Sequence, residues 1–278
     1  MDEGRPETAH QGRLPVNELK GEVALITGAA GGIGRAICKK FAGEGAAILA
    51  LDLDGEGLNG LAEELQVSGC KVRTILADIT DGQDVAAKVR QAGDLLGTPT
   101  ILVNNAGGAR DLNLKETTPQ NWRSDLALNL DGAFNCVEAV RQGMMDGGYG
   151  VIVNIGSVNG LLSLGHPAYS VAKAGLIQYT KALAVEFGAY GLRANIVCPG
   201  TVKTQLWDER IAKNPKVMED LLKWYPLNAV PDTEDIAEAA LFLASPRARA
   251  ITGIVLPVDA GLTAGNLPLT RELTQEAR

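Results

Sequence analysis

The sequence predicts an α/β fold, a single doubly wound domain with a seven-stranded, mostly parallel sheet and helices on both faces. The chain has 278 residues, 46% of them hydrophobic and 21% charged, which is enough apolar material for one large core. Short apolar segments alternate with segments of helical apolar spacing, the pattern typical of βαβ units. The short segments are apolar at nearly every position, as strands covered on both faces are.

The individual elements follow from this alternation. Strands are expected over 22–27, 46–52, 71–78, 100–107, 150–157, 193–200 and 253–259, and helices over about 33–44, 56–66, 82–96, 117–145, 167–188 and 233–244. The stretch 201–230 departs from the rhythm, because aromatic residues and prolines stand there among many charges, and it is interpreted as a flap of short helices over a substrate.

No linker divides the chain. A nucleotide-binding domain is therefore expected over 17–266, with a disordered tail at 1–16 and a C-terminal tail at 267–278.

Charge and composition exclude several classes of function. The net charge is −7 and the basic residues are scattered, which argues against nucleic acid as a partner. No apolar run reaches the length of a membrane span. The four cysteines are far apart and there are only two histidines, so neither disulfides nor a metal site is expected. The predictions are a cytoplasmic location and a small-molecule substrate.

A glycine-rich turn follows the first expected strand. Gly28, Gly32 and Gly34 form the spacing GxxxGxG, whereas Gly28, Gly31 and Gly34 form GxxGxxG, and the glycines alone do not decide between them. Both patterns let the backbone approach a pyrophosphate at the N-terminus of a helix. The turn indicates a dinucleotide site of the Rossmann type, with Ile33 beside it.

Asp52 ends the second strand, 18 residues after Gly34, where a carboxylate can bind the adenosine ribose and repel a 2′-phosphate. No Arg or Lys lies within 28–34 or 51–58, and Arg35 is expected to continue into the helix. NAD is therefore predicted rather than NADP. Asp54 competes for this role, but Asp52 is preferred because it directly follows the apolar run, with Leu53 beside it. Asp78 and Ile79, which end the third strand, are expected along the adenine.

Four motifs occur in order along the chain: "TGAAGGIG" (27–34), "NNAG" (104–107), "YSVAK" (169–173) and "CPG" (198–200). Together they resemble the short-chain dehydrogenases/reductases, from about Leu19 to Gly265. NNAG and the absence of an extra C-terminal substrate domain resemble the short, oligomeric branch of that family, which uses GxxxGxG. This resemblance implies a homotetramer joined through the helices 117–145 and 167–188.

The resemblance also assigns roles to residues. The catalytic set it implies is Asn129, Ser157, Tyr169 and Lys173. The cofactor-binding set it implies, besides the residues already named and the Tyr169–Lys173 pair, is Asn105, Ala106, Gly107, Pro199, Gly200, Val202 and Thr204. Asn129 would hold a water of a proton relay, and Ser157 would orient the substrate.

Tyr169 and Lys173 stand four residues apart and therefore share a helix face. An ammonium beside a phenol favours the phenolate and lowers its pKa, which suits the phenol to exchange a proton with an alcohol or a ketone. The favoured function is an NAD(H)-dependent oxidoreductase that interconverts a secondary alcohol and a ketone.

Two alternatives are an NADPH-dependent 3-oxoacyl-thioester reductase and a catalytically silent NAD-binding relative. The substrate pocket is expected from 108–114, 158–168 and 201–226, and a small polyol, sugar or hydroxy acid is favoured as substrate. His166, which precedes Pro167, is interpreted as a capping or packing residue.

Overall fold

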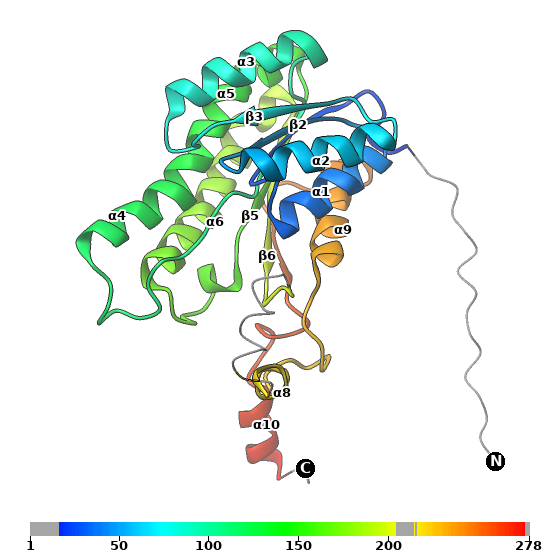
Figure 1. Cartoon of the computed structure of the whole chain (residues 1–278). Coiled ribbons are helices and arrows are strands. Elements are labelled where there is room, and N and C mark those ends of the chain that lie inside the picture. Colours follow the sequence, from blue (N-terminus) through cyan, green and yellow to red (C-terminus); the bar gives the residue numbers. More distant parts are fainter. Residues whose placement is uncertain (1–16, 204–213, 215, 276–278) are drawn as a thin grey trace, which may run out of the picture.

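Seven parallel strands form one sheet in the order β3-β2-β1-β4-β5-β6-β7 (Figure 1). The structure is a computed structural model that describes residues 17–203, 214 and 216–275. The strands are β1 (Val23–Thr27), β2 (Ala47–Asp52), β3 (Val72–Leu76), β4 (Ile101–Asn104), β5 (Gly150–Ile155), β6 (Leu192–Pro199) and β7 (Val255–Val258). This sheet is the predicted doubly wound architecture, with every strand parallel.

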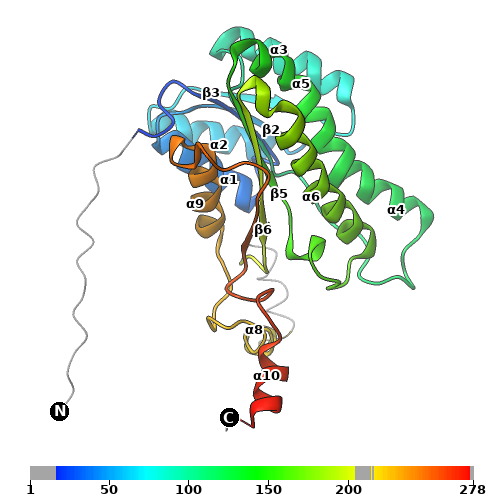
Figure 2. The same ribbon diagram turned by 180° about the vertical axis from the view of Figure 1, so that it is seen from behind.

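Helices cover both faces of the sheet. They are α1 (Gly32–Gly43), α2 (Gly55–Val67), α3 (Gly82–Leu96), α4 (Pro119–Leu126), α5 (Gly132–Gly147), α6 (Pro167–Phe187), α8 (Val217–Leu222), α9 (Thr233–Ala244) and α10 (Leu267–Thr274). Helices α1, α2 and α9 lie on one side of the sheet, and α3, α5 and α6 lie on the other, as the front and back views show (Figures 1 and 2).

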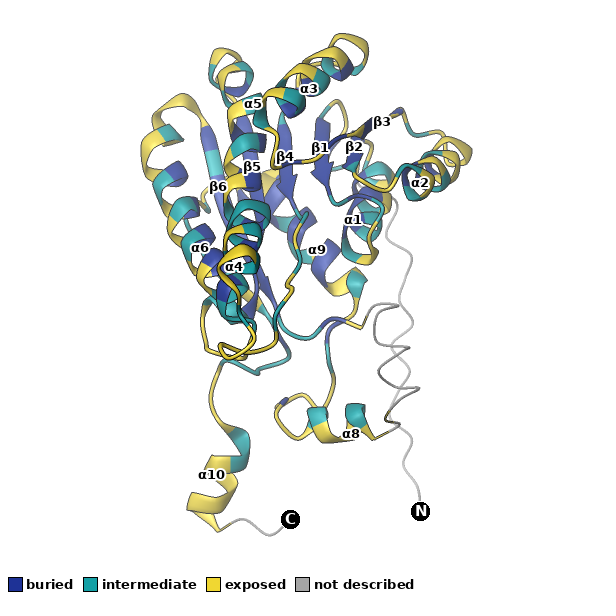
Figure 3. Cartoon of the chain, turned by 60° about the vertical axis from the view of Figure 1, so that its left-hand side comes forward, coloured by how far each residue is buried: buried dark blue, intermediate teal, exposed yellow. Residues whose placement is uncertain are grey.

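The core consists of two apolar layers separated by the sheet. Along β1, Ala24 and Ile26 join the layer beneath α1 and α9, whereas Val23 and Leu25 join the layer beneath α3 and α5. This alternation follows from the two-residue period of a strand, and all five residues of β1 are buried. In Figure 3 the central strands β1, β4 and β5 are buried, and many exposed residues lie on the outer sides of the helices. No helix among residues 17–203 and 216–275 is long and apolar enough to cross a membrane.

Three strands end two or three residues earlier than predicted. The third, fourth and fifth strands were expected to end at residues 78, 107 and 157, but β3, β4 and β5 end at residues 76, 104 and 155. Their apolar and small residues continue past the hydrogen-bonded ladder into loops at the carboxyl ends. Because the apolar pattern continues, the sequence pattern alone assigned these residues to strands. The loops supply most of the candidate site.

The helix expected over 117–145 is also interrupted. A π-helical turn, Ala127–Asp131, separates α4 from α5. Within the predicted flap, the structure has the short helix α8, and α10 lies within the predicted C-terminal tail. Helices α8 and α10 extend beyond the end of the sheet (Figure 1). The predicted tail at 1–16 and Thr204 lie outside the described residues.

Strand order places the site. The chain runs outward from β1 through β2 to β3 and then returns to place β4 on the other side of β1. The connections leave a crevice at the carboxyl ends of β1 and β4, and ligands of doubly wound sheets bind at such a reversal point.

Candidate active site

The glycine-rich turn between β1 and α1 is held against the loop after β4. Gly28 has a left-handed backbone (φ +63°), and a Cβ on Gly34 would stand 2.0 Å from the Gly28 carbonyl oxygen. The Asn105 side chain donates to the carbonyls of Thr27 and Gly28, both at 3.0 Å. These contacts fix a cradle of backbone that no larger residue than glycine could form at positions 28 and 34. Gly31 and Gly32 are exposed at its rim.

Asp52 closes the far end of this cradle. One carboxylate oxygen accepts the Ala30 N–H at 2.9 Å, and the other accepts the Leu53 and Asp54 N–H groups at 2.7 and 3.1 Å. The Asp54 side chain caps α2 by accepting the Gly57 N–H at 3.0 Å. Because Asp54 has this capping role, Asp52 is the carboxylate that connects the glycine turn to the end of β2.

A cavity of about 770 Å³ opens above the cradle. Its lining consists of Gly28, Ala30, Gly31, Gly32, Ile33, Leu51, Asp52, Leu53, Asp54, Ala77, Asp78, Ile79, Asn105, Ala106, Gly107 and Leu128. Asp78 accepts the Thr80 N–H and hydroxyl at 2.9 and 2.8 Å, and Ile79 is buried. The glycine cradle, the helix N-terminus and the carboxylate suit the pyrophosphate and ribose of a dinucleotide, so the residues present fit such a cofactor.

A second cavity, of about 790 Å³, adjoins the first. The two share Ile33, Asn105 and Gly107 in their linings. Three of the four residues predicted to be catalytic line the second cavity, namely Ser157, Tyr169 and Lys173. An elongated ligand can therefore reach from Asp52 to Tyr169.

Lys173 and Tyr169 lie together on α6, as their spacing predicts. The Lys173 ammonium is 5.5 Å from the centre of the Tyr169 ring and donates to the Ile155 carbonyl at 2.8 Å. Lys173 is 3% exposed and Ser157 8% exposed. Ser157 Oγ accepts the Asn159 N–H at 3.1 Å, so the residue two positions later orients the hydroxyl.

Burial governs the protonation of this pair. It raises the pKa of the Tyr169 phenol, while a hydrogen bond with Ser157 acts in the opposite direction. Burial also lowers the pKa of Lys173 to about 8. The sequence argument expected the ammonium to lower the pKa of the phenol. In the structure, removal of both groups from water is the larger effect, because desolvation disfavours each charged form.

Asn129 lies in the π-helical turn between α4 and α5. Its side-chain NH₂ donates to the carbonyls of Gly108 and Asp125 at 2.7 and 2.9 Å, and its oxygen accepts the Gly108 N–H at 3.1 Å. Asp125 is buried and forms an ion pair with Arg110 at 2.7 Å. Through its hydrogen bonds with Gly108, the Asn129 side-chain amide faces the loop after β4 rather than the cavity. A π turn such as this one is frequent at functional sites.

The loop after β6 forms another wall. Pro199, Gly200 and Val202 line the second cavity, as expected for the segment beside the nicotinamide. The Thr201 N–H donates to the Tyr225 hydroxyl at 3.0 Å, and Tyr225 is 1% exposed. The tyrosine therefore anchors the segment before α9 to this loop.

Sequence reasoning assigned no individual role to Thr27, Asn159 or Tyr225. Thr27 Oγ1 accepts the N–H groups of Asn105 and Ala106, both at 3.0 Å, and is buried. A threonine at the end of an apolar strand is the available signal for Thr27. Nothing in the local pattern indicates that Asn159 and Tyr225 contact Ser157 and Thr201, because those contacts depend on loop conformation.

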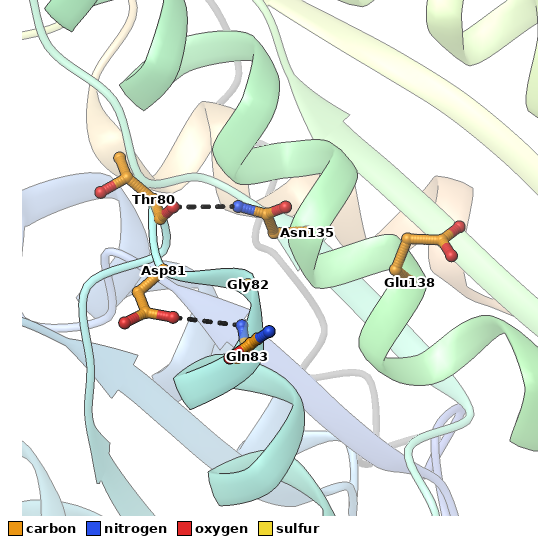
Figure 4. A pocket seen from close by; sticks show the side chains of 6 residues that line it. All are labelled: Thr80, Asp81, Gly82, Gln83, Asn135 and Glu138. Carbon is orange, nitrogen blue, oxygen red and sulfur yellow. Dashed lines mark hydrogen bonds between the residues drawn. The ribbon is translucent and has the colours of Figure 1, made fainter.

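A separate hollow of about 520 Å³ lies between α3 and α5 (Figure 4). Its polar side chains hold the two helices and the preceding loop. Asp81 caps α3 by accepting the Gln83 and Asp84 N–H groups, and Asn135 donates to the carbonyls of Ile79 and Thr80. None of the predicted site residues lines it.

Comparison with known proteins agrees with this geometry. Residues 28–263 match the family model described as enoyl-(acyl carrier protein) reductase. A crystal structure of an oxidoreductase of the short-chain dehydrogenase/reductase family from Burkholderia thailandensis is 48% identical, with a TM-score of 0.86 over 92% of this chain and 98% of that one. The chain belongs to the short-chain dehydrogenase/reductase family. A Schizosaccharomyces pombe oxidoreductase is 40% identical over 260 residues, 93% of this chain and 97% of that protein.

Solved relatives differ in the cofactor they contain. A gluconate 5-dehydrogenase from Burkholderia cenocepacia, in complex with NADP and tartrate, is 32% identical with a TM-score of 0.84, covering 90% of this chain and 98% of that one. An NAD⁺-bound xylitol dehydrogenase is 28% identical with a TM-score of 0.84, covering 87% and 99%. The chain is thus an oxidoreductase of a family that binds a nicotinamide cofactor and includes dehydrogenases of alcohols and polyols.

Proposed function

We propose that the chain is an NAD(H)-dependent dehydrogenase that interconverts a secondary alcohol and a ketone, with a small polyol, sugar or hydroxy acid as substrate. The observation that carries this proposal is the arrangement of the two adjoining cavities. Asp52 stands in one, and Tyr169, Lys173 and Ser157 line the other. The polyol and gluconate dehydrogenases among the solved relatives support the substrate class.

The chain's own residues handle the proton. A bound nicotinamide accepts or supplies the hydride at the reacting carbon. The Tyr169 phenol gives its proton to the ketone oxygen in reduction and takes the hydroxyl proton in oxidation. Ser157 hydrogen-bonds to the same oxygen. The buried Lys173 ammonium favours the phenolate when Tyr169 loses its proton.

Electrostatics around the cradle favours NAD over NADP. The Asp52 carboxylate would repel a 2′-phosphate. The Arg35 guanidinium is held against α2, since it forms an ion pair with Glu64 and also donates to the Gly57 carbonyl. Lys39 pairs with the same glutamate at 2.6 Å. Glu64 thus engages Arg35 and Lys39, two of the three basic side chains of α1.

The proposal is tested by measuring hydride transfer to NAD⁺ and NADP⁺. The absorbance of the reduced cofactor at 340 nm is followed with secondary alcohols, polyols and hydroxy acids as substrates. Tyr169→Phe should lower kcat by about 10² to 10⁴, the range of general acid–base catalysis, with little change in cofactor binding. Tyr190→Phe is the matched control, because Tyr190 is exposed and lies beyond the end of α6. Equal activity of Tyr169→Phe and the unmodified chain would contradict the assignment.

Asp52→Ser tests the cofactor preference. Removal of the carboxylate should shift the ratio of kcat/KM for NAD⁺ to that for NADP⁺ toward NADP⁺. A further Glu64→Ala substitution should increase this shift, since it releases Arg35. Faster reaction of the unmodified chain with NADPH and acetoacetyl-CoA than with NADH and simple ketones would instead support the 3-oxoacyl-thioester reductase, the activity that the name of a 36% identical Pseudomonas aeruginosa relative gives. The binding-protein alternative expects cofactor binding without turnover of any substrate.

A further inference from the structure

His166 forms part of the substrate cavity wall at the start of α6. Its backbone is left-handed (φ +49°), a conformation uncommon for residues other than glycine. Pro167 follows it and begins the helix. A residue is kept in such a conformation when its surroundings determine it, and these conformations cluster at functional sites.

The imidazole is held by one hydrogen bond. Nδ1 lies 3.0 Å from the Asp111 carbonyl oxygen, and the His166 N–H donates to the Leu112 carbonyl at 3.0 Å. Asp111 is held in turn by Asn121, whose side chain donates to its carboxylate at 2.8 Å. A carbonyl oxygen can only accept, so Nδ1 carries the proton. In the neutral ring Nε2 is then an acceptor, and no hydrogen bond joins it to any residue that the structure describes.

The ring stands beside the reacting group. The His166 and Tyr169 ring centres are 6.4 Å apart, with the planes at 77°, and both residues line the same cavity. Nearby lining residues from the loop before α6 and from α8 and its end are apolar, namely Leu164, Leu221 and Trp224. Among these side chains His166 offers an acceptor close to the Tyr169 ring.

We propose that His166 determines substrate specificity by accepting a hydrogen bond from a second hydroxyl of the substrate, near the reacting carbinol. The inference rests on the proposed function and narrows its substrate class to vicinal diols and polyols. A carboxylate or a thioester carbonyl offers only acceptors, which do not pair with the Nε2 lone pair. The histidine therefore favours a polyol over a hydroxy acid or a 3-oxoacyl thioester.

The test compares NAD⁺-dependent oxidation of 2,3-butanediol and threitol with that of 2-butanol and 3-hydroxybutyrate. His166→Asn keeps a residue that tolerates the left-handed backbone, and His166→Phe keeps a flat ring without nitrogen. In both variants kcat/KM for the diol or tetrol should fall about tenfold relative to 2-butanol, the effect of one lost hydrogen bond. Asn121→Ala, which loosens Asp111 and with it the imidazole, should lower the same substrate ratio by a smaller factor, and 2-butanol is the internal control in every variant.

Two results would overturn the inference while the proposed function stands. An equal loss for 2-butanol and the diols would assign His166 a purely structural role. A selective loss for 3-hydroxybutyrate would mean that the ring binds a carboxylate. If the unmodified chain binds NAD⁺ but oxidises none of these alcohols, the proposed function itself fails, and the inference falls with it.

Discussion

At the scale of single residues, the site depends on a lysine that water does not reach. Lys173 is almost fully buried, and its ammonium donates a hydrogen bond to the Ile155 carbonyl. Its neighbour on the same helix face, Tyr169, has a raised pKa for the same reason, removal from water. Burial shifts both groups toward their uncharged forms, the amine of Lys173 and the phenol of Tyr169. A bound anion or a phenolate would raise the pKa of Lys173 again.

This burial predicts a pH-dependent stability. Burial lowers the pKa of Lys173 in the folded chain to about 8, from the ordinary lysine value of 10.5. Below pH 8 both folded and unfolded chains carry the ammonium, and its burial costs about 3 kcal/mol. Between pH 8 and 10.5 the unfolded chain binds more protons, so this cost disappears as the pH rises. Lys173→Met lacks the titrating group.

The free energy of unfolding of the unmodified chain, minus that of Lys173→Met, should therefore increase by about 3 kcal/mol from pH 7 to pH 10.5. Urea unfolding at several pH values measures it, and the subtraction removes the titration of the other groups. A difference that stays flat or decreases with pH would show that water reaches the ammonium in the folded chain.

At the scale of elements, the loop after β4 is the meeting point of the site. Gly107 lies between the π-helical turn and α6. A Cβ there would stand 2.6 Å from Asn129 Oδ1 and 3.3 Å from Lys173 Nζ. At the next residue, Gly108, the nearest atom would be Leu128 Cδ2 at 3.9 Å, an ordinary contact. Two adjacent glycines therefore differ in what they can tolerate.

Gly107→Ala should displace the asparagine or the lysine and lower kcat/KM by at least tenfold, whereas Gly108→Ala should have a much smaller effect. Steady-state kinetics with NAD⁺ measures both, and the melting temperature of each variant reports whether the fold is retained. Equal losses in the two variants would mean that the loop as a whole, rather than the contact at Gly107, limits activity.

The sequence predicts the regular elements of the fold but not the conformation of these loops. Short runs that are apolar at nearly every position predict seven strands, and segments with helical apolar spacing predict the principal helices. They do not predict where β4 ends or that a π turn divides α4 from α5. Those features depend on contacts between distant residues, such as Asn105 with Gly28 and Asn129 with Gly108.

The identity of several site residues is likewise predicted from the sequence, whereas their protonation and contacts are not. Spacing alone pairs Tyr169 with Lys173, and the strand end selects Asp52. Their protonation could not be predicted, because the burial of Lys173 arises only when β5, β6 and α6 pack together. His166 was interpreted as a capping or packing residue. The structure places it at the N-cap position of α6 without a side-chain cap, and its ring is held by the Asp111 carbonyl and packs against the Tyr169 ring.

At the scale of the whole molecule, an apolar surface remains on the outer side of α5 and α6. Phe134 is 47% exposed, Val171 48% and Val185 81%, and the Phe134 ring contacts that of Tyr179 from α6. Exposed apolar residues that gather on two adjacent long helices indicate an interface. The homotetramer remains a prediction, and this surface is the one through which the resemblance expects it to form.

Val185→Glu tests the assembly. A charge placed in an apolar interface is desolvated and unpaired, so the variant should dissociate into smaller assemblies. Each chain should stay folded, because the Val185 side chain is 81% exposed within its own chain. Val67→Glu is the matched control, because Val67 is 90% exposed but lies at the end of α2, on the opposite side of the sheet. Light scattering coupled to gel filtration should give about four times 29.2 kDa for the unmodified chain and for Val67→Glu, and a smaller mass for Val185→Glu. A mass of 29.2 kDa for the unmodified chain would exclude the tetramer, and an unchanged tetramer in Val185→Glu would move the interface away from α6.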